Sequence, residues 1–172
     1  MANTFIKLGG VELTSTQSSL DFTSIPQTYT DLILVCSLRT TNAGDFGFPI
    51  LRFNGLGTVN MSHRGLMYES GTVSGGTNNE GLVVRRCPGG NAPADYFGSA
   101  TIWISNYASS TTNKFFTGVF GSPRNQQTGS AVGMNACAWS DTAAITQVSI
   151  FDNQGYSFAQ YSSAYLYGVS NA

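Results

Sequence analysis

The sequence predicts an all-β protein, an antiparallel β-sandwich of jelly-roll-like form. Apolar residues alternate with polar ones or form short runs, and no stretch longer than about ten residues shows a helical period. Turn-forming clusters interrupt these runs at Asn54-Gly55, Pro88-Gly89-Gly90 and Asn153-Gln154-Gly155. The pattern contains no helices of the kind that parallel crossovers need, which disfavours an α/β fold.

The predicted strands follow one another along the whole chain. In the run 31–39, Leu32, Leu34, Cys36 and Leu38 fall on one face, so Cys36 is expected to be a small buried hydrophobe. In 99–104 the side chain of Trp103 takes the face opposite to its neighbours. The strands are expected at 4–8, 11–13, 19–22, 31–39, 49–53, 65–68, 82–86, 99–104, 115–120, 131–139, 145–151 and 164–169.

Two segments are rich in loop-forming residues. Residues 71–81, which include the turn-forming pair Gly75-Gly76, and residues 122–129 are expected to be surface loops. Both are too short to link domains, and 172 residues fit one domain, so 1–172 is predicted to be a single β-sandwich domain. The absence of an internal repeat argues against a long fibrous shaft.

The composition points to a neutral polar surface. Charged residues make up 10% of the chain, against about 25% in a typical soluble domain. A surface of this kind suits a subunit covered by copies of itself or by a partner, and it also suits carbohydrate-binding modules and fibre proteins. The net charge is −1 and the basic residues are scattered, so nucleic-acid binding is not expected.

The cysteines and the apolar runs limit where the protein works. Cys36, Cys87 and Cys137 form an odd, widely spaced set, which fits neither a disulfide framework nor a zinc site. The first residues lack the basic start and long apolar core of a signal peptide. No apolar run approaches the roughly 20 residues of a membrane span. Synthesis in a reducing cytoplasm, without unaided entry into membranes, is expected.

The sequence nominates no catalytic, cofactor-binding or metal-binding residue, and the chain is not expected to be an enzyme. His63 is the only histidine, and no nucleophile motif accompanies it, so it is interpreted as a locally hydrogen-bonded residue. The nine acidic residues stand mainly beside turns or at strand ends, where carboxylates commonly cap the backbone. No calcium loop or phosphate-binding loop is present in the sequence.

A protein–protein interface is the remaining kind of site, and four residues are assigned to it. Arg85 and Arg86 follow an apolar run and could meet acidic groups on a neighbour, although two solvated strand-end arginines would show the same pattern. Tyr96 and Phe97 are assigned to the same interface. The other aromatic residues could line a sugar-binding face, but core packing or subunit contact is the favoured interpretation for Trp139, Tyr165 and Tyr167.

Four segments resemble, in their order and spacing, the small virion structural proteins of tailed bacteriophages. They are LDFTSIPQTYTDLIL at 20–34, LRFNG at 51–55, IWISNY at 102–107 and the final YLYGV at 165–169, where this family tends to have isoleucine in place of Val169. In physical terms, Ile25-Pro26 forces an extended entry, Tyr29 is expected to plug the end of the sandwich, and Asn54-Gly55 is expected to close a hairpin.

The resemblance implies synthesis in the host bacterial cytoplasm, a place in the virion and no catalytic activity. Capsid decoration (cement) is the favoured role, with contacts to the major capsid protein or other virion proteins. The alternative is a head- or tail-fibre module that binds a bacterial surface glycan. A depolymerase is the least favoured possibility. A homo-oligomer, trimer or dimer, is expected from the general habit of closed cyclic symmetry.

Overall fold

The computed structural model describes residues 4–56, 60–78, 84, 86–122 and 130–170. These residues form strands, turns and loops, and none of them lies in a helix that could cross a membrane. Neighbouring strands pair antiparallel throughout. The main sheet contains, in spatial order, β1 (Phe5–Glu12), β13 (Ser163–Val169), β3 (Asp31–Leu38), β9 (Gly98–Ser105), β10 (Lys114–Ser122), β11 (Ala131–Trp139), β6 (Met61–Glu69) and β7 (Thr72–Asn78).

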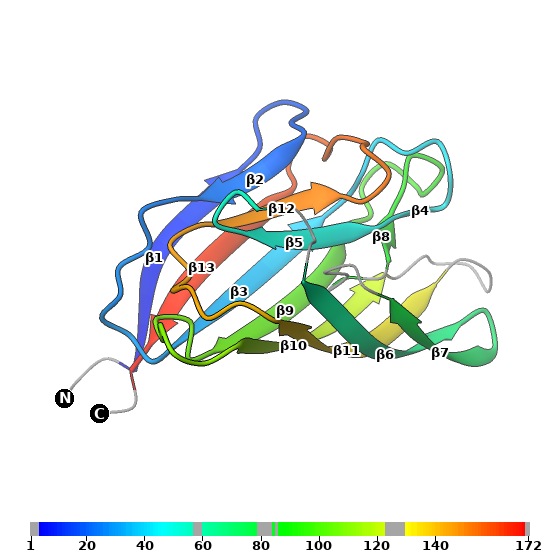
Figure 1. The fold of residues 1–172 in the computed structure, drawn as a ribbon. Helices are drawn as coiled ribbons and strands as arrows, with labels where there is room; N and C mark the ends of the chain where they lie inside the picture. Colours follow the sequence, from blue (N-terminus) through cyan, green and yellow to red (C-terminus); the bar gives the residue numbers. More distant parts are fainter. Residues whose placement is uncertain (1–3, 57–59, 79–83, 85, 123–129, 171–172) are drawn as a thin grey trace.

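Two smaller sheets accompany the main sheet. One is three-stranded, in the order β2 (Ser19–Phe22), β12 (Val148–Asp152) and β5 (Pro49–Phe53), and it lies over one face of the main sheet (Figure 1). The other pairs β4 (Phe46–Gly47) with β8 (Cys87–Pro88). The predicted antiparallel β-sandwich is therefore confirmed, while the jelly-roll arrangement stays a prediction.

The core lies between the main sheet and the three-stranded sheet. Period-two alternation turns Leu32, Leu34, Cys36 and Leu38 of β3 inward, and all four are buried as predicted. Phe53 of β5 reaches across the layers, with its ring centroid 5.3 Å from those of Phe116 and Trp139. These aromatic contacts join the two sheets into one hydrophobic cluster.

Most predicted strands are present, and the differences have simple causes. The predicted strands at 19–22, 49–53 and 131–139 have the observed bounds, and those at 4–8 and 11–13 are two parts of β1. The interpretation of 71–81 as a loop is wrong over Thr72–Asn78, which is β7. Gly75-Gly76 is extended backbone there because pairing with β6 outweighs the low strand propensity of glycine. The predicted strand at 82–86 and the loop at 122–129 lie mostly outside the described residues.

The Asn54-Gly55 turn forms, but it does not close a hairpin. Asn54 and Gly55 have φ values of 55° and 69°, and the amide of Leu56 donates to the carbonyl of Phe53. The strand before the turn, β5, pairs with β12, whereas β6 belongs to the main sheet. The expectation of a hairpin was wrong because the turn sends the chain from one layer of the sandwich to the other.

Tyr29 contacts the core at the entry to β3, as the sequence predicts. It is half-buried against the hydrophobic cluster, and its ring covers Gly168 so closely that a Cβ there would lie 2.5 Å from Tyr29 Cγ. The preceding Pro26 carbonyl accepts a hydrogen bond from the hydroxyl of buried Tyr107. Three segments that are far apart in the sequence, 20–34, 102–107 and 165–169, therefore meet at this end of the sandwich.

Arg39, which follows β3, holds the loop between β8 and β9. Its side chain is buried, and its guanidinium donates to four backbone carbonyls of that loop, those of Gly90, Ala92, Pro93 and Tyr96. A planar fork of five N–H donors can serve several carbonyls at once, which a lysine ammonium cannot do in the same geometry. The loop that ends at Tyr96 and Phe97 therefore depends on a side chain more than 50 residues away in the sequence.

Candidate functional site

The outward-facing side of the main sheet carries exposed apolar side chains at one end. Each is more than half exposed, and together they occupy four adjacent strands, from β10 to the edge strand β7. We call them the outer apolar face: Leu66, Tyr68, Val73, Val119, Val132 and Met134. Scattered exposed apolar residues are common on soluble proteins, but a contiguous group of this size usually marks an interaction surface.

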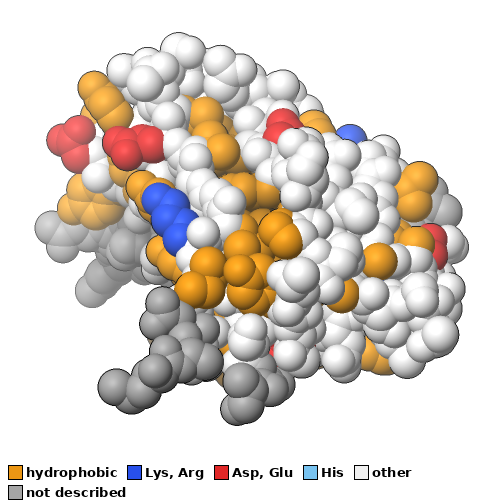
Figure 2. Space-filling view, turned by 90° about the vertical axis from the view of Figure 1, so that its left-hand side faces the viewer, with side chains coloured by type: hydrophobic (Ala, Val, Ile, Leu, Met, Phe, Trp, Pro, Cys, Tyr) orange, Lys and Arg blue, Asp and Glu red, His pale blue; other side chains and the backbone are white. Residues whose placement is uncertain are grey.

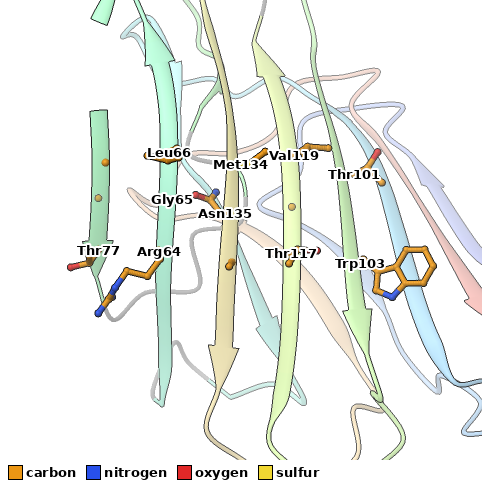
Figure 3. A pocket seen from close by; sticks show the side chains of 14 residues that line it. Arg64, Gly65, Leu66, Thr77, Thr101, Trp103, Thr117, Val119, Met134 and Asn135 are labelled. Carbon is orange, nitrogen blue, oxygen red and sulfur yellow. The ribbon is translucent and has the colours of Figure 1, made fainter. Parts of the chain in front are cut away.

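Strand register places these side chains in rows across the sheet. Residues directly opposite one another share a face, so one row runs through Thr101, Val119, Met134, Leu66 and Gly75. A second row lies two residues further along and is more polar: Trp103, Thr117, Ala136, Arg64 and Thr77. Figure 3 shows labelled members of both rows, crossing the strands side by side.

The rows line a groove that is open to solvent. Its volume is about 870 Å³, and a neighbouring hollow of about 600 Å³ shares Leu66, Thr101, Val119 and Met134 with it. The walls are mainly apolar, because β10 and β11 carry apolar side chains on both faces and the second sheet covers only the inner face. Arg64 is the only charged residue lining either hollow within the described part of the chain.

Trp103 is held at the opposite end of the groove from Arg64. Its indole Nε1 donates to the Asp31 carboxylate at 3.0 Å, and the other oxygen of Asp31 accepts from the amide of Asn106 at 2.9 Å. The residue is half-buried and lines one end of the groove, and its ring lies on the side of β9 away from Thr117 (Figure 3). The carboxylate therefore fixes the ring in one orientation at the end of the groove.

The structure does not place the three described residues of the assigned interface, Arg86, Tyr96 and Phe97, on the outer apolar face. Arg85 lies outside the described residues. Arg86 pairs with Glu69 of its own chain at 3.2 Å and stacks over the rings of Phe46 and Phe48, so its acidic partner is internal. Tyr96 and Phe97 are half-buried at the end of the loop that Arg39 holds.

The single histidine lies away from the groove. His63 is 3% exposed on the inner face of β6, opposite Cys137 of β11. Within the described ranges, no group of three or more His, Cys, Asp or Glu side chains is arranged to hold a metal ion. The three cysteines are buried free thiols, and burial raises the pKa of the Cys36 and Cys137 thiols to about 12.

Sequence reasoning missed the outer apolar face, although a signal for it was present. The segments 115–120 and 131–139 have apolar residues at both odd and even positions, such as Phe115 and Phe116, so both faces of the sheet had to be apolar there. The sequence alone does not reveal that the covering sheet is three strands wide and shields only one face. Trp139, assigned to the core or to subunit contact, is in the core, and Tyr165 and Tyr167 are half-buried in β13.

The surface in Figure 2 carries few charges, as the 10% of charged residues in the sequence predicts. Figure 2 shows the side of the molecule at the left of Figure 1, where charged side chains are few and a band of hydrophobic side chains runs between neutral polar ones. No family model, curated protein or solved structure matches the chain in the comparisons.

Proposed function

We propose that this protein is a structural subunit of a bacteriophage virion, and that it decorates the capsid by packing its outer apolar face against neighbouring capsid proteins. The observation that carries this proposal is the outer apolar face itself, six contiguous side chains that are each more than half exposed. Removing apolar surface from water contributes roughly 25 cal/mol per Å² to the free energy of binding, so contact of this face with another protein is favourable. A nearly uncharged rim adds little desolvation cost.

Several features favour a structural role over catalysis. The groove is lined mainly by apolar, glycine and threonine residues, and the only charged group that lines it in the described chain is Arg64. Acid–base or nucleophilic catalysis needs titratable groups within hydrogen-bond reach of one another. The surface is instead suited to shape-matched contact, in which a few buried apolar anchors supply most of the binding energy.

A substitution in the centre of the face tests capsid decoration. Met134→Lys is expected to weaken binding to heads of the phage that encodes this chain by about tenfold or more, because a charge would be buried without a partner. The free energy of unfolding should change by less than about 0.5 kcal/mol, since residue 134 is exposed in the free protein. Binding is measured by co-sedimentation with heads that lack the protein, and stabilisation by the shift in head melting temperature.

Tyr156→Lys is the matched control, because Tyr156 is an exposed aromatic residue in a loop after β12, away from the outer apolar face. It should bind heads as the wild type does. Equal loss of binding in both variants would contradict the role of the outer apolar face. Absence of the protein from purified particles by mass spectrometry would contradict the virion proposal as a whole.

The second candidate function is a fibre-type module that binds a surface glycan, and the fixed ring of Trp103 favours it. The row that begins at this tryptophan, which a carboxylate holds, continues through Thr117 to Arg64 and Thr77, and so offers an aromatic ring and hydrogen-bonding groups. Under this alternative, Trp103→Ala should reduce binding of the free protein to host cells or their polysaccharide by about tenfold, while Met134→Lys should have the smaller effect. Capsid decoration predicts the reverse order in the head-binding assay.

A further inference from the structure

The two edges of the main sheet differ in how they guard against pairing with another strand. The β1 edge is interrupted by a bulge between Lys7 and Gly9 and carries charges at Lys7 and Glu12. Charges and bulges of this kind keep edge strands from joining other sheets. The opposite edge, β7, has the sequence TVSGGTN, without charge, proline or bulge, and keeps continuous register with β6 over its whole length (Figure 1).

No described strand pairs with the outer edge of β7, whose one neighbour in the sheet is β6. An extended edge of seven residues presents a row of backbone donors and acceptors to its surroundings. Val73 is 70% exposed, the highest value among the exposed large hydrophobic residues, and lies on this edge strand. The edge therefore combines backbone N–H and C=O groups that pair with no described strand and an exposed apolar side chain.

Gly75, at the midpoint of β7, has no explanation within a single copy of the chain. Its φ is not in the left-handed region, which glycine occupies at Gly55, Gly71 and Gly155. A Cβ at Gly75 would meet its nearest neighbours at 3.9 Å, which is ordinary van der Waals contact. Glycine weakens a strand, and where neither conformation nor space within the chain demands it, glycine often marks a close approach by another backbone.

We propose that β7 pairs antiparallel with β7 of a second copy of this chain, with the two-fold axis passing at Gly75. This register is the one that pairs all seven residues of both strands. It places Gly75 opposite its own copy, and Val73 opposite Thr77 of the second copy. The main sheets of the two copies become one continuous sheet, in which the outer apolar faces lie on the same side.

The charges near this seam are compatible with the symmetry. Arg64 is the neighbour of Thr77 in β6, so the two copies of Arg64 lie toward opposite ends of the seam. Glu69, beside Thr72 at the other end, is already paired with Arg86 of its own chain. No like charges face each other across the strand pair. The interface goes beyond capsid decoration and does not depend on it, because it forms between free molecules in solution.

Cysteine cross-linking tests the register. A residue on the two-fold axis faces its own copy, so Gly75→Cys should form an intermolecular disulfide with oxidised glutathione, seen as a covalent dimer on a non-reducing gel. Val73→Cys is the matched control. It lies on the same strand and the same face but opposite residue 77, so it should give little covalent dimer. The native thiols are buried and should not react in the folded protein.

Paired charges test the interface without a covalent bond. Val73→Lys with Thr77→Lys places lysines opposite each other twice across the seam, and should raise the dimer dissociation constant by about tenfold or more. Val73→Lys with Thr77→Glu places opposite charges there and should retain the dimer. Both positions are exposed, so circular dichroism and urea unfolding should show both variants folded. Sedimentation velocity over a range of concentrations gives the dissociation constants.

Each outcome decides the proposal. A wild-type dimer that is weakened by the lysine pair, retained by the lysine–glutamate pair and trapped by Gly75→Cys supports it. A monomer at all concentrations, a trimer, or a dimer that is indifferent to both charge variants overturns it. Because these measurements use the free protein, their failure leaves the head-binding result unchanged, and a failure of head binding leaves this one unchanged.

Discussion

Replacing Arg39 with methionine is expected to lower the free energy of unfolding by about 3 kcal/mol. Methionine keeps much of the apolar stem but removes the donors that bind the carbonyls of Gly90, Ala92, Pro93 and Tyr96. Each buried carbonyl left without a donor costs about 1–3 kcal/mol, and water entering from the nearby surface recovers part of that loss. Urea unfolding followed by tryptophan fluorescence measures the change.

Two companion variants separate the lost hydrogen bonds from the lost charge. Arg39→Lys keeps the charge but not the planar fork, so its stability should fall between those of the wild type and Arg39→Met. Arg52→Met removes an arginine whose main contact is the ring of Phe151, at 4.4 Å from the centroid, and should cost only about 1 kcal/mol. If Arg39→Met cost no more than Arg52→Met, the anchoring role of Arg39 would be wrong.

Alkaline pH is expected to destabilise the protein through its three buried thiols. Burial raises the pKa of Cys36 and Cys137 from 9.0 to about 12, and burial together with the charge of Asp152 raises the pKa of Cys87 as well. The unfolded chain releases these protons near pH 9 while the folded chain keeps them. Above pH 9 the unfolded state therefore binds fewer protons, and the free energy of unfolding falls as the pH rises.

The expected size of this effect is large. At pH 10.5 each thiol contributes a loss of about 2 kcal/mol, so three thiols remove about 6 kcal/mol, which is comparable to the whole stability of many domains. Lys114 acts in the opposite sense. Its ammonium is buried, with hydrogen bonds to the carbonyls of Thr112 and Thr142, and burial lowers its pKa, so its contribution to stability improves as the pH rises toward 10.5.

Urea midpoints at pH 8.0, 9.5 and 10.5 measure the loss of stability. The variant with all three cysteines replaced by alanine keeps every tyrosine and lysine, and should lose much less stability between pH 8.0 and 10.5 than the wild type. Buried Tyr107 also has a pKa raised by burial, so a small residual slope should remain. Parallel pH profiles for the wild type and the triple variant would rule out the thiols as the cause.

The sequence predicted the strands well because strand formation here follows a local pattern. Alternation in 31–39 and 99–104 identified the buried faces of β3 and β9, and the turn residues marked where most strands end. β7 was missed because its stability comes from β6, which glycine-rich composition does not reveal. The pairing of Arg86 with Glu69, 17 residues away in the sequence, could not be predicted, because contacts between separate segments are not visible in the spacing of residues.

By itself the sequence determined the class of the fold, the face of each long strand that is buried, and a surface poor in charge. These properties depend on composition and on residues one or two positions apart, so they do not depend on how distant segments pack. Only the tertiary structure decided which faces stay uncovered, because a three-stranded layer over an eight-stranded sheet leaves apolar side chains in water. The binding of Arg39 to four distant carbonyls and the unguarded edge at β7 likewise arise from the packing of distant segments.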